Sequence, residues 1–355
     1  MDRVAGDRHL GTDGLAAQLG DRVGHRSPPA TRHHRHLRAL SAAALPGFLA
    51  ACDGPLSTLD PAGPGAAAVA WLWWVMLAAS LPILALVCGF ALYAFRRERR
   101  GQGLQVRRFV IGWGLVFPVS VLAVLLVVSL RTGEALLARP EEPDVVRVTA
   151  IGHRWWWEFI QTDAAGQALH SANELHIPAG QKVEVRIEAR DVIHSFWVPR
   201  LTGKMDAIPG HPNLLRLQAD APGVYDGQCA EFCGLQHARM RFRVRAHPPE
   251  EYAAALARLA AARPDPAHPG AAPFTQNCAS CHSADPAQAS AAPNLAGLAQ
   301  RDRLGAGALE YRDAGDLRLW LTRHERIKPG SGEPSHAALP AAELDAIIAY
   351  LESAR

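Results

Sequence analysis

Four side chains that bind soft metals fall within one short stretch of this 355-residue sequence. Cys229 and Cys233 are four positions apart, His237 follows four positions later, and Met240 comes three positions after that. A single folded loop can turn all four side chains toward one point. A fifth candidate, His194, lies in the separate segment DVIHSFWVP. Thiolates, imidazoles and a thioether together form a ligand set that selects copper.

A zinc site and a disulfide are the alternatives to copper at these residues. Two Cys and two His could close a tetrahedral zinc site, although zinc does not use the thioether of Met240. A disulfide between Cys229 and Cys233 suits an oxidising compartment, but it accounts for neither His194 nor His237. Two thiolates can bridge a pair of copper ions, each capped by one histidine, with Met and a backbone carbonyl as weak outer ligands. We therefore predict a binuclear copper centre.

A second chemical signature lies near the C-terminus, where Cys278, Cys281 and His282 spell C-x-x-C-H. This is the attachment signal for c-type haem, with two thioether bonds and a proximal histidine on the iron. A chance match is the alternative. The helical pattern LPAAELDAIIAYLESAR that ends the chain favours the haem. Residues 271–355 resemble a class I cytochrome c, which implies an all-α domain.

The expected distal ligand of this haem is missing. The cytochrome family places a methionine in a loop reading roughly KPG-x-x-MP, whereas this chain reads KPGSGEPSH with Glu333 at the methionine position. The haem domain contains no methionine, because the four in the chain are Met1, Met76, Met205 and Met240. We predict His336 as the substitute, with His324, Lys328, Glu333 or an open position as competitors and a surface histidine as the alternative. Loss of the Met ligand should lower the haem potential.

Two uncharged apolar runs, 69–95 and 109–130, each exceed the ~20 residues that cross a bilayer. They predict a transmembrane hairpin. The connecting loop, 96–108, has six arginines and one glutamate. The positive-inside rule therefore places this loop in the cytoplasm, and it places Cys52 and everything after Leu130 on the outer, periplasmic side. Cys88 lies within the first span and is interpreted as an apolar filler.

The first 51 residues have the pattern of an extension followed by a signal peptide. A basic segment, RHHRHLR, precedes an apolar run that ends in Leu-Ala-Ala-Cys52. These last four residues resemble a bacterial lipobox, which would make Cys52 the lipidated first residue of the mature chain. An ordinary signal peptide with an incidental cysteine is the alternative. Residues 52–68 then form a short periplasmic segment before the first span.

Short alternating apolar runs between 140 and 247 predict an antiparallel β-sandwich or barrel. An Ala-rich helix and a Pro/Gly-rich linker, 248–270, separate it from the haem domain. Residues 140–250 hold 12 Lys and Arg against 14 Asp and Glu, so nothing supports nucleic-acid binding.

The motif C-x-E-x-C-x-x-x-H-x-x-M, preceded by HSFWVP and GHRWWWEF, resembles cytochrome c oxidase subunit II. The resemblance implies a multidomain membrane protein with a two-helix transmembrane hairpin, an all-β cupredoxin-like Greek-key barrel and a fused class I cytochrome c domain. It also implies roles for individual residues: copper bridging by Cys229 and Cys233, terminal imidazoles from His194 and His237, weak ligation by Met240 and by the Glu231 carbonyl, magnesium binding by the Glu231 side chain with a partner subunit, and electron entry at Trp155.

The function that the resemblance implies is electron transfer within an oxidase of the bacterial inner membrane. Electrons from cytochrome c, or from the chain's own haem c, would pass through the copper pair to the catalytic subunit I, with subunit III also in the complex. The catalytic subunit would reduce oxygen, because this chain has no oxygen-reducing centre of its own. A copper-centre subunit of a nitric oxide reductase and a copper-handling membrane protein are the alternatives.

Overall fold

The computed structural model describes residues 53–96, 103–136 and 145–354. The predicted lipidation site, Cys52, and the signal-like segment 1–51 lie outside the described residues. So do residues 97–102 of the loop that the sequence places in the cytoplasm.

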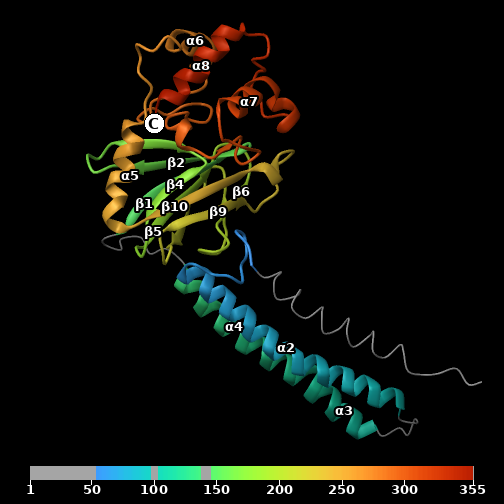
Figure 1. Cartoon of the computed structure of the whole chain (residues 1–355). Coiled ribbons are helices and arrows are strands. Elements are labelled where there is room, and N and C mark those ends of the chain that lie inside the picture. Colours follow the sequence, from blue (N-terminus) through green and yellow to red (C-terminus); the bar gives the residue numbers. More distant parts are fainter. Residues whose placement is uncertain (1–52, 97–102, 137–144, 355) are drawn as a thin grey trace, which may run out of the picture. The chain divides into compact units, whose positions relative to one another are not determined.

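Two long apolar helical segments form the predicted hairpin (Figure 1). The first is α2 (Pro64–Arg96). The second consists of α3 (Gly103–Ile111), a π-helical turn (Gly112–Val116) and α4 (Phe117–Leu136). Both segments extend beyond the predicted spans, because helical backbone continues past the end of each apolar run.

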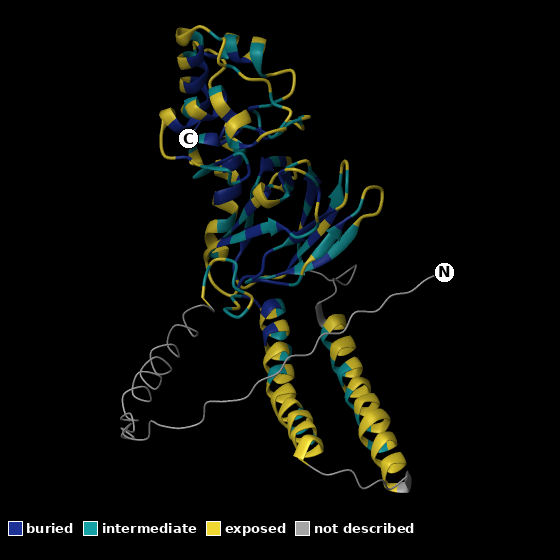
Figure 2. Cartoon of the chain, turned by 90° about the vertical axis from the view of Figure 1, so that its right-hand side faces the viewer, coloured by how far each residue is buried: buried dark blue, intermediate teal, exposed yellow. Residues whose placement is uncertain are grey.

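The side chains of the hairpin are mostly exposed, as Figure 2 shows by the yellow colour of both segments. Exposed apolar side chains over such a length suit a lipid environment. The two segments contact one another where the Phe90 ring meets the rings of Phe109 and Trp113, at centroid distances of 5.3 and 5.6 Å. The hairpin therefore has an aromatic contact of its own.

Ten strands between residues 146 and 247 form two five-stranded sheets, in the orders β3-β2-β1-β5-β8 and β4-β10-β9-β6-β7. Their apolar side chains meet between the sheets and make one core. The strands are β1 (Val146–His153), β2 (Trp156–Thr162), β3 (Ala168–Ala172), β4 (Glu174–Pro178), β5 (Val183–Ala189), β6 (His194–Trp197), β7 (Met205–Ala207), β8 (Asn213–Leu217), β9 (Gly223–Cys229) and β10 (Arg241–His247).

The prediction of a purely antiparallel arrangement is wrong at two pairs. Strands β1 and β5 run parallel, as do β4 and β10. Parallel neighbours need a long crossover connection. For β1 and β5, that connection includes β4 in the other sheet. The β-sandwich is thus a mixed one, and its closure into a Greek-key barrel stays a prediction.

An aromatic cluster fills the sandwich core beneath the ligand-bearing loop. Trp157, Phe196 and Phe242 lie within 5.6 Å of one another by ring centroid. Gly227 lets the Phe242 ring lie directly on the backbone of β9, because a Cβ at this position would come within 2.3 Å of that ring. This close packing gives rigid support to the loop that follows β9.

The C-terminal domain is mainly helical, with one hairpin of two-residue strands. Its buried core gathers side chains from the three helices α6, α7 and α8. Asp313 caps α7, because its side chain accepts hydrogen bonds from the backbone N–H groups of Gly315 and Asp316. The elements, with the preceding helix, are α5 (Pro249–Ala261), α6 (Ala271–Asn277), the 3₁₀ turn Leu298–Gln300, β11 (Arg303–Leu304), β12 (Leu309–Glu310), α7 (Ala314–Ile327) and α8 (Ala341–Ser353).

Candidate metal centres

Strand pairing brings the predicted copper ligands together. Residue Cys229 ends β9, where it lies opposite Phe196 of β6, and this pairing brings in His194 at the start of β6. The Cys229 backbone N–H also donates to the Met240 carbonyl at 3.0 Å. Backbone hydrogen bonds therefore fix the start of the ligand loop, at Cys229, and its end, at Met240.

The sulfur and nitrogen atoms of the set converge as the sequence predicts. The two Sγ atoms of Cys229 and Cys233 are 3.8 Å apart, far beyond the ~2.05 Å of a disulfide. Nδ1 of His194 is 4.0 Å from the Cys229 sulfur, and Nδ1 of His237 is 3.6 Å from the Cys233 sulfur. The Met240 Sδ atom is 3.8 Å from the Cys233 sulfur.

The backbone carbonyl of Glu231 completes the cluster, at 3.2 Å from the Cys229 sulfur. The Glu231 side chain is half-buried. Met240 is fully buried, with 0% exposure, so its thioether is committed to this cluster and is not free to reach the haem domain.

One residue that contacts the cluster, Asp191, could not be identified from the sequence. Asp191 Oδ1 lies 2.8 Å from His194 Nε2, which leaves Nδ1 facing the thiols. Burial alone would lower the pKa of His194, but hydrogen bonds to Cys229 and Asp191 outweigh it and raise that pKa. An Asp three positions before a His was the available signal, and it was too common to single out.

The two thiols are not equivalent. The hydrogen bond from Cys233 outweighs burial and lowers the pKa of Cys229 to about 4. The same hydrogen bond, followed by burial, raises the pKa of Cys233. The cluster therefore holds one thiolate at neutral pH, and the thiolate is the form that binds metal.

The three consecutive tryptophans differ in burial: Trp155 precedes β2, and Trp156 and Trp157 begin it. Trp156 and Trp157 are buried, at 8% and 0% exposure, which matches the predicted core role. Trp155 is half-buried, and its Nε1 donates to the Cys233 carbonyl at 3.0 Å. Trp155 therefore contacts the ligand loop directly.

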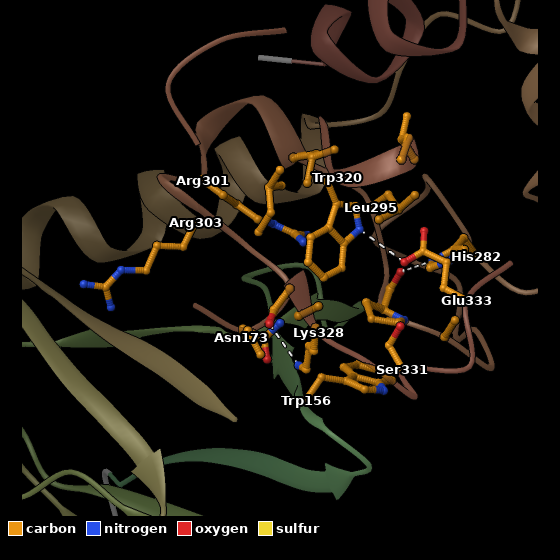
Figure 3. Close-up of a pocket in the computed structure, with 18 of the residues that line it drawn as sticks. Trp156, Asn173, His282, Leu295, Arg301, Arg303, Trp320, Lys328, Ser331 and Glu333 are labelled. Carbon is orange, nitrogen blue, oxygen red and sulfur yellow. Dashed lines mark hydrogen bonds between the residues drawn. The ribbon is translucent and has the colours of Figure 1, made fainter. Parts of the chain in front are cut away.

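A cavity of about 340 Å³ lies beside Trp155 and is lined by both domains. The C-x-x-C-H residues Cys278, Cys281 and His282 line it, and Figure 3 shows His282 in the cavity wall. The His282 Nδ1 atom lies 2.7 Å from the Pro293 carbonyl. That contact leaves Nε2 available as an iron ligand, which is the usual arrangement for a ligating histidine.

The four candidate distal ligands of the haem differ in whether they line the cavity and in what they bond to. Glu333 and His336 line the cavity, and His324 does not. The ammonium group of Lys328 is engaged elsewhere, because it donates to the carbonyls of Trp155 and Gly305 at 2.6 and 2.9 Å. Lys328 lines the cavity as well, but its ammonium is bonded to these carbonyls, so Glu333 and His336 are the lining candidates that remain for a haem iron.

Comparison with known proteins agrees with both sites. The family model described as "Cytochrome C oxidase subunit II, periplasmic domain" matches residues 146–247, and the model for cytochrome c matches residues 267–355. Cytochrome c oxidase subunit 2 of Alkalihalophilus pseudofirmus is 33% identical over 330 residues, which cover 86% of this chain and 93% of that protein. The chain belongs to the cytochrome c oxidase subunit 2 family.

The corresponding subunit 2 of Bacillus subtilis is 30% identical over 353 residues, with 90% of this chain and 98% of that protein covered. A crystal structure of the periplasmic domain of subunit II from Bradyrhizobium japonicum is 29% identical, with a TM-score of 0.31. It covers 33% of this chain and 94% of that domain. The subunit 2 family thus matches this chain across the copper-type and haem-type domains together.

Proposed function

We propose that this chain is the electron-transfer subunit of a cytochrome c oxidase, with a binuclear copper centre and one covalently attached haem c. The observation that carries the proposal is the position of Trp155. Its side chain donates to the Cys233 carbonyl of the copper loop, and it also lines the haem cavity. One residue therefore contacts both candidate redox sites.

The residues present fit a pair of copper ions. Cys229 and Cys233 would bridge the ions, His194 and His237 would cap one ion each, and Met240 and the Glu231 carbonyl would be weak ligands. Soft sulfur donors with imidazoles favour copper over harder metals. When bound, the copper pair accepts and passes on one electron at a time. The protein fixes the ligand positions through β9, β10 and the Asp191–His194 contact.

The C-terminal residues fit a haem c. Cys278 and Cys281 would form the thioether bonds, and His282 would bind the iron through Nε2. Both cysteines are free thiols. His336, the distal ligand predicted from sequence, and Glu333 are the two cavity side chains that remain as candidates.

The surroundings of Trp155 favour the chain's own haem as the immediate donor. The Lys328 ammonium of the haem domain donates to the Trp155 carbonyl. The Gln236 side-chain amide of the copper loop donates to the Pro329 carbonyl at 2.7 Å. A soluble cytochrome c would then deliver its electron to the haem domain instead of to Trp155.

The two apolar segments serve in this proposal as an anchor in the bacterial inner membrane and as a packing surface for subunits I and III. Both functional domains would face the periplasm, with Cys52 as the lipidated start of the mature chain. The Glu231 carboxylate would bind magnesium together with subunit I.

The proposal is tested by purifying the membrane complex and measuring oxygen uptake with reduced cytochrome c. Oxygen uptake, together with an electron paramagnetic resonance signal of a mixed-valence copper pair, is the expected result. Turnover of nitric oxide without oxygen uptake would instead assign the chain to a nitric oxide reductase.

A further inference from the structure

We propose that the carboxylate of Glu333 is the distal ligand of the haem iron, on the side opposite His282. This inference rests on the proposed attachment of haem c at Cys278 and Cys281, and it names the residue that replaces the expected methionine. Carboxylate ligation would make the haem of this subunit chemically different from a Met-ligated one.

The position of Glu333 is held at two points. The Trp320 Nε1–H donates to the Glu333 carboxylate Oε2 at 3.2 Å (Figure 3). His324 Nε2 lies 2.7 Å from the Glu333 backbone carbonyl. Trp320 and His324 are both buried, on either side of the non-helical residue Arg323 in α7, so two buried side chains hold the main chain and the side chain of Glu333. A fixed carboxylate loses little further conformational entropy when it binds a metal.

The loop before Glu333 has the conformation needed to return it to the cavity wall. Gly330 and Gly332 have φ values of +73° and +77°, in the left-handed region that favours glycine. Glu333 follows directly and lines the cavity. The sequence KPGSGE thus places an acidic side chain where the methionine is expected.

One oxygen of Glu333 remains free to bind. Trp320 engages Oε2, while Oε1 makes no hydrogen bond, and the carboxylate no ion pair, with any residue that the structure describes. Glu333 is half-buried, and it acts on Lys328 by electrostatic attraction without forming an ion pair with it. A ferric iron would place a positive charge in direct contact with the carboxylate.

His336 lacks the support that a ligating histidine normally has. Its backbone N–H donates to the Leu321 carbonyl at 3.1 Å, but its ring makes no hydrogen bond within the described part of the chain. A metal-bound histidine almost always donates its second ring N–H to a partner, as the His282–Pro293 contact allows. By this criterion Glu333 is prepared for ligation and His336 is not.

The remaining candidates have other commitments. The ammonium of Lys328 donates to two carbonyls. The Nε2 atom of His324 faces the Glu333 carbonyl, and its buried Nδ1 does not line the cavity. Met240 lies against the Cys233 sulfur.

An anionic oxygen ligand has two measurable effects. It stabilises ferric over ferrous iron through its negative charge, so the midpoint potential should lie below that of a Met-ligated haem. A carboxylate oxygen exerts a weaker ligand field on iron than a thioether or a second imidazole does. The ferric haem should therefore also be high-spin.

The test uses the full-length chain in its purified complex. Optical and electron paramagnetic resonance spectra of the ferric haem, and its midpoint potential, are measured for the wild type and for Glu333→Met, Glu333→Gln and His336→Gln, with Glu343→Gln as the matched control. The wild type should be high-spin. Glu333→Met should become low-spin, gain the band diagnostic of Met sulfur and shift to a higher potential. Glu333→Gln should raise the potential, while His336→Gln and Glu343→Gln should match the wild type.

Covalently bound haem is quantified in each variant, so that failed attachment, which would count against the haem itself, is distinguished from a changed ligand. A wild-type spectrum typical of two imidazole ligands, lost in His336→Gln and retained in Glu333→Gln, would overturn the assignment. So would a spectrum and a potential that none of the three substitutions changes.

Discussion

Gly152 lies directly against the ring of His194. A Cβ atom built on Gly152 would be 2.7 Å from Cδ2 of His194 and 3.0 Å from its Cγ. The contact is not with a flexible end, because the His194 ring is buried and tied to Asp191. Gly152 is therefore a positioning residue for a proposed copper ligand, although it offers no ligand atom itself.

We expect Gly152→Ala to weaken copper binding by displacing His194. Overpacking of this kind typically costs about 1–3 kcal/mol, which corresponds to a loss in affinity of about 5- to 150-fold when all of it falls on copper binding. Copper content and the copper resonance signal are measured after dialysis against a chelator. The control is Gly203→Ala, because a Cβ there meets nothing within 4 Å. Equal copper retention in both variants would contradict the prediction.

The Met240→Leu substitution should keep the copper and change its properties. Leu fills nearly the same buried volume, so the stability cost should stay below about 1.5 kcal/mol. Loss of a weak thioether ligand should shift the copper potential and its resonance signal. The same change at Met205, which is half-buried in β7, is the control. A changed haem spectrum in Met240→Leu would mean instead that Met240 serves the haem.

Substitution of Trp155 by Phe should slow electron transfer between the haem and the copper site. The change keeps an aromatic ring but removes the N–H that donates to the Cys233 carbonyl. We expect a loss of about tenfold, equivalent to 1.36 kcal/mol in the barrier. Flash-induced electron transfer in the purified complex measures it. The control is Trp71→Phe on α2, and an unchanged rate for Trp155→Phe would exclude the route.

Lys328 makes the stability of its surroundings depend on pH. Its pKa is lowered to about 7, chiefly by burial; Cys233 and Glu333 oppose this lowering, and Arg239 adds to it. Between pH 7 and the usual value of 10.5, the unfolded chain therefore binds more protons than the folded one. Stability should rise with pH across that window, with a slope of up to about 1.4 kcal/mol per pH unit.

Denaturant unfolding of the full chain at several pH values between 7 and 10 tests this dependence. Lys328→Met should flatten the rise, because its side chain does not titrate. Lys204→Met is the control at an exposed lysine with a carboxylate neighbour, Asp206. A slope that survives in Lys328→Met would assign the effect to another group.

The proposed copper ligands could be singled out from the sequence because four of them lie on one loop at fixed spacing. Gly152 could not, since its role depends on the contact of β1 in one sheet with His194 of β6 in the other. Asp191 could not either, because an Asp three positions before a His is too common a spacing to single out.

Strand alternation places Trp156 and Trp157 on opposite faces, and it could not show that both are buried, because Trp156 packs separately with Ala172 and Ala306. Strand alternation also could not give the direction of each strand's partner, and for this reason the parallel pairs β1–β5 and β4–β10 were missed.

The haem domain shows a different limit of sequence reasoning. Composition alone excluded a methionine ligand, because the chain has no methionine after Met240. Residue type then favoured His336, since imidazole is the commoner iron ligand. The hydrogen bond from Trp320 is what favours Glu333 over His336 in our proposal, and a side-chain contact between α7 and the loop that follows it leaves no mark in the sequence.

The Lys328–Trp155 contact also has a kinetic consequence. A donor joined to its acceptor by a short linker is present at a millimolar or higher effective concentration, and docking does not have to be repeated for each electron. Internal transfer should then be independent of protein concentration and nearly insensitive to ionic strength. Salt should affect only the bimolecular step in which an external donor docks and reduces the haem domain. That docking step then takes place at the haem domain and not at the copper site.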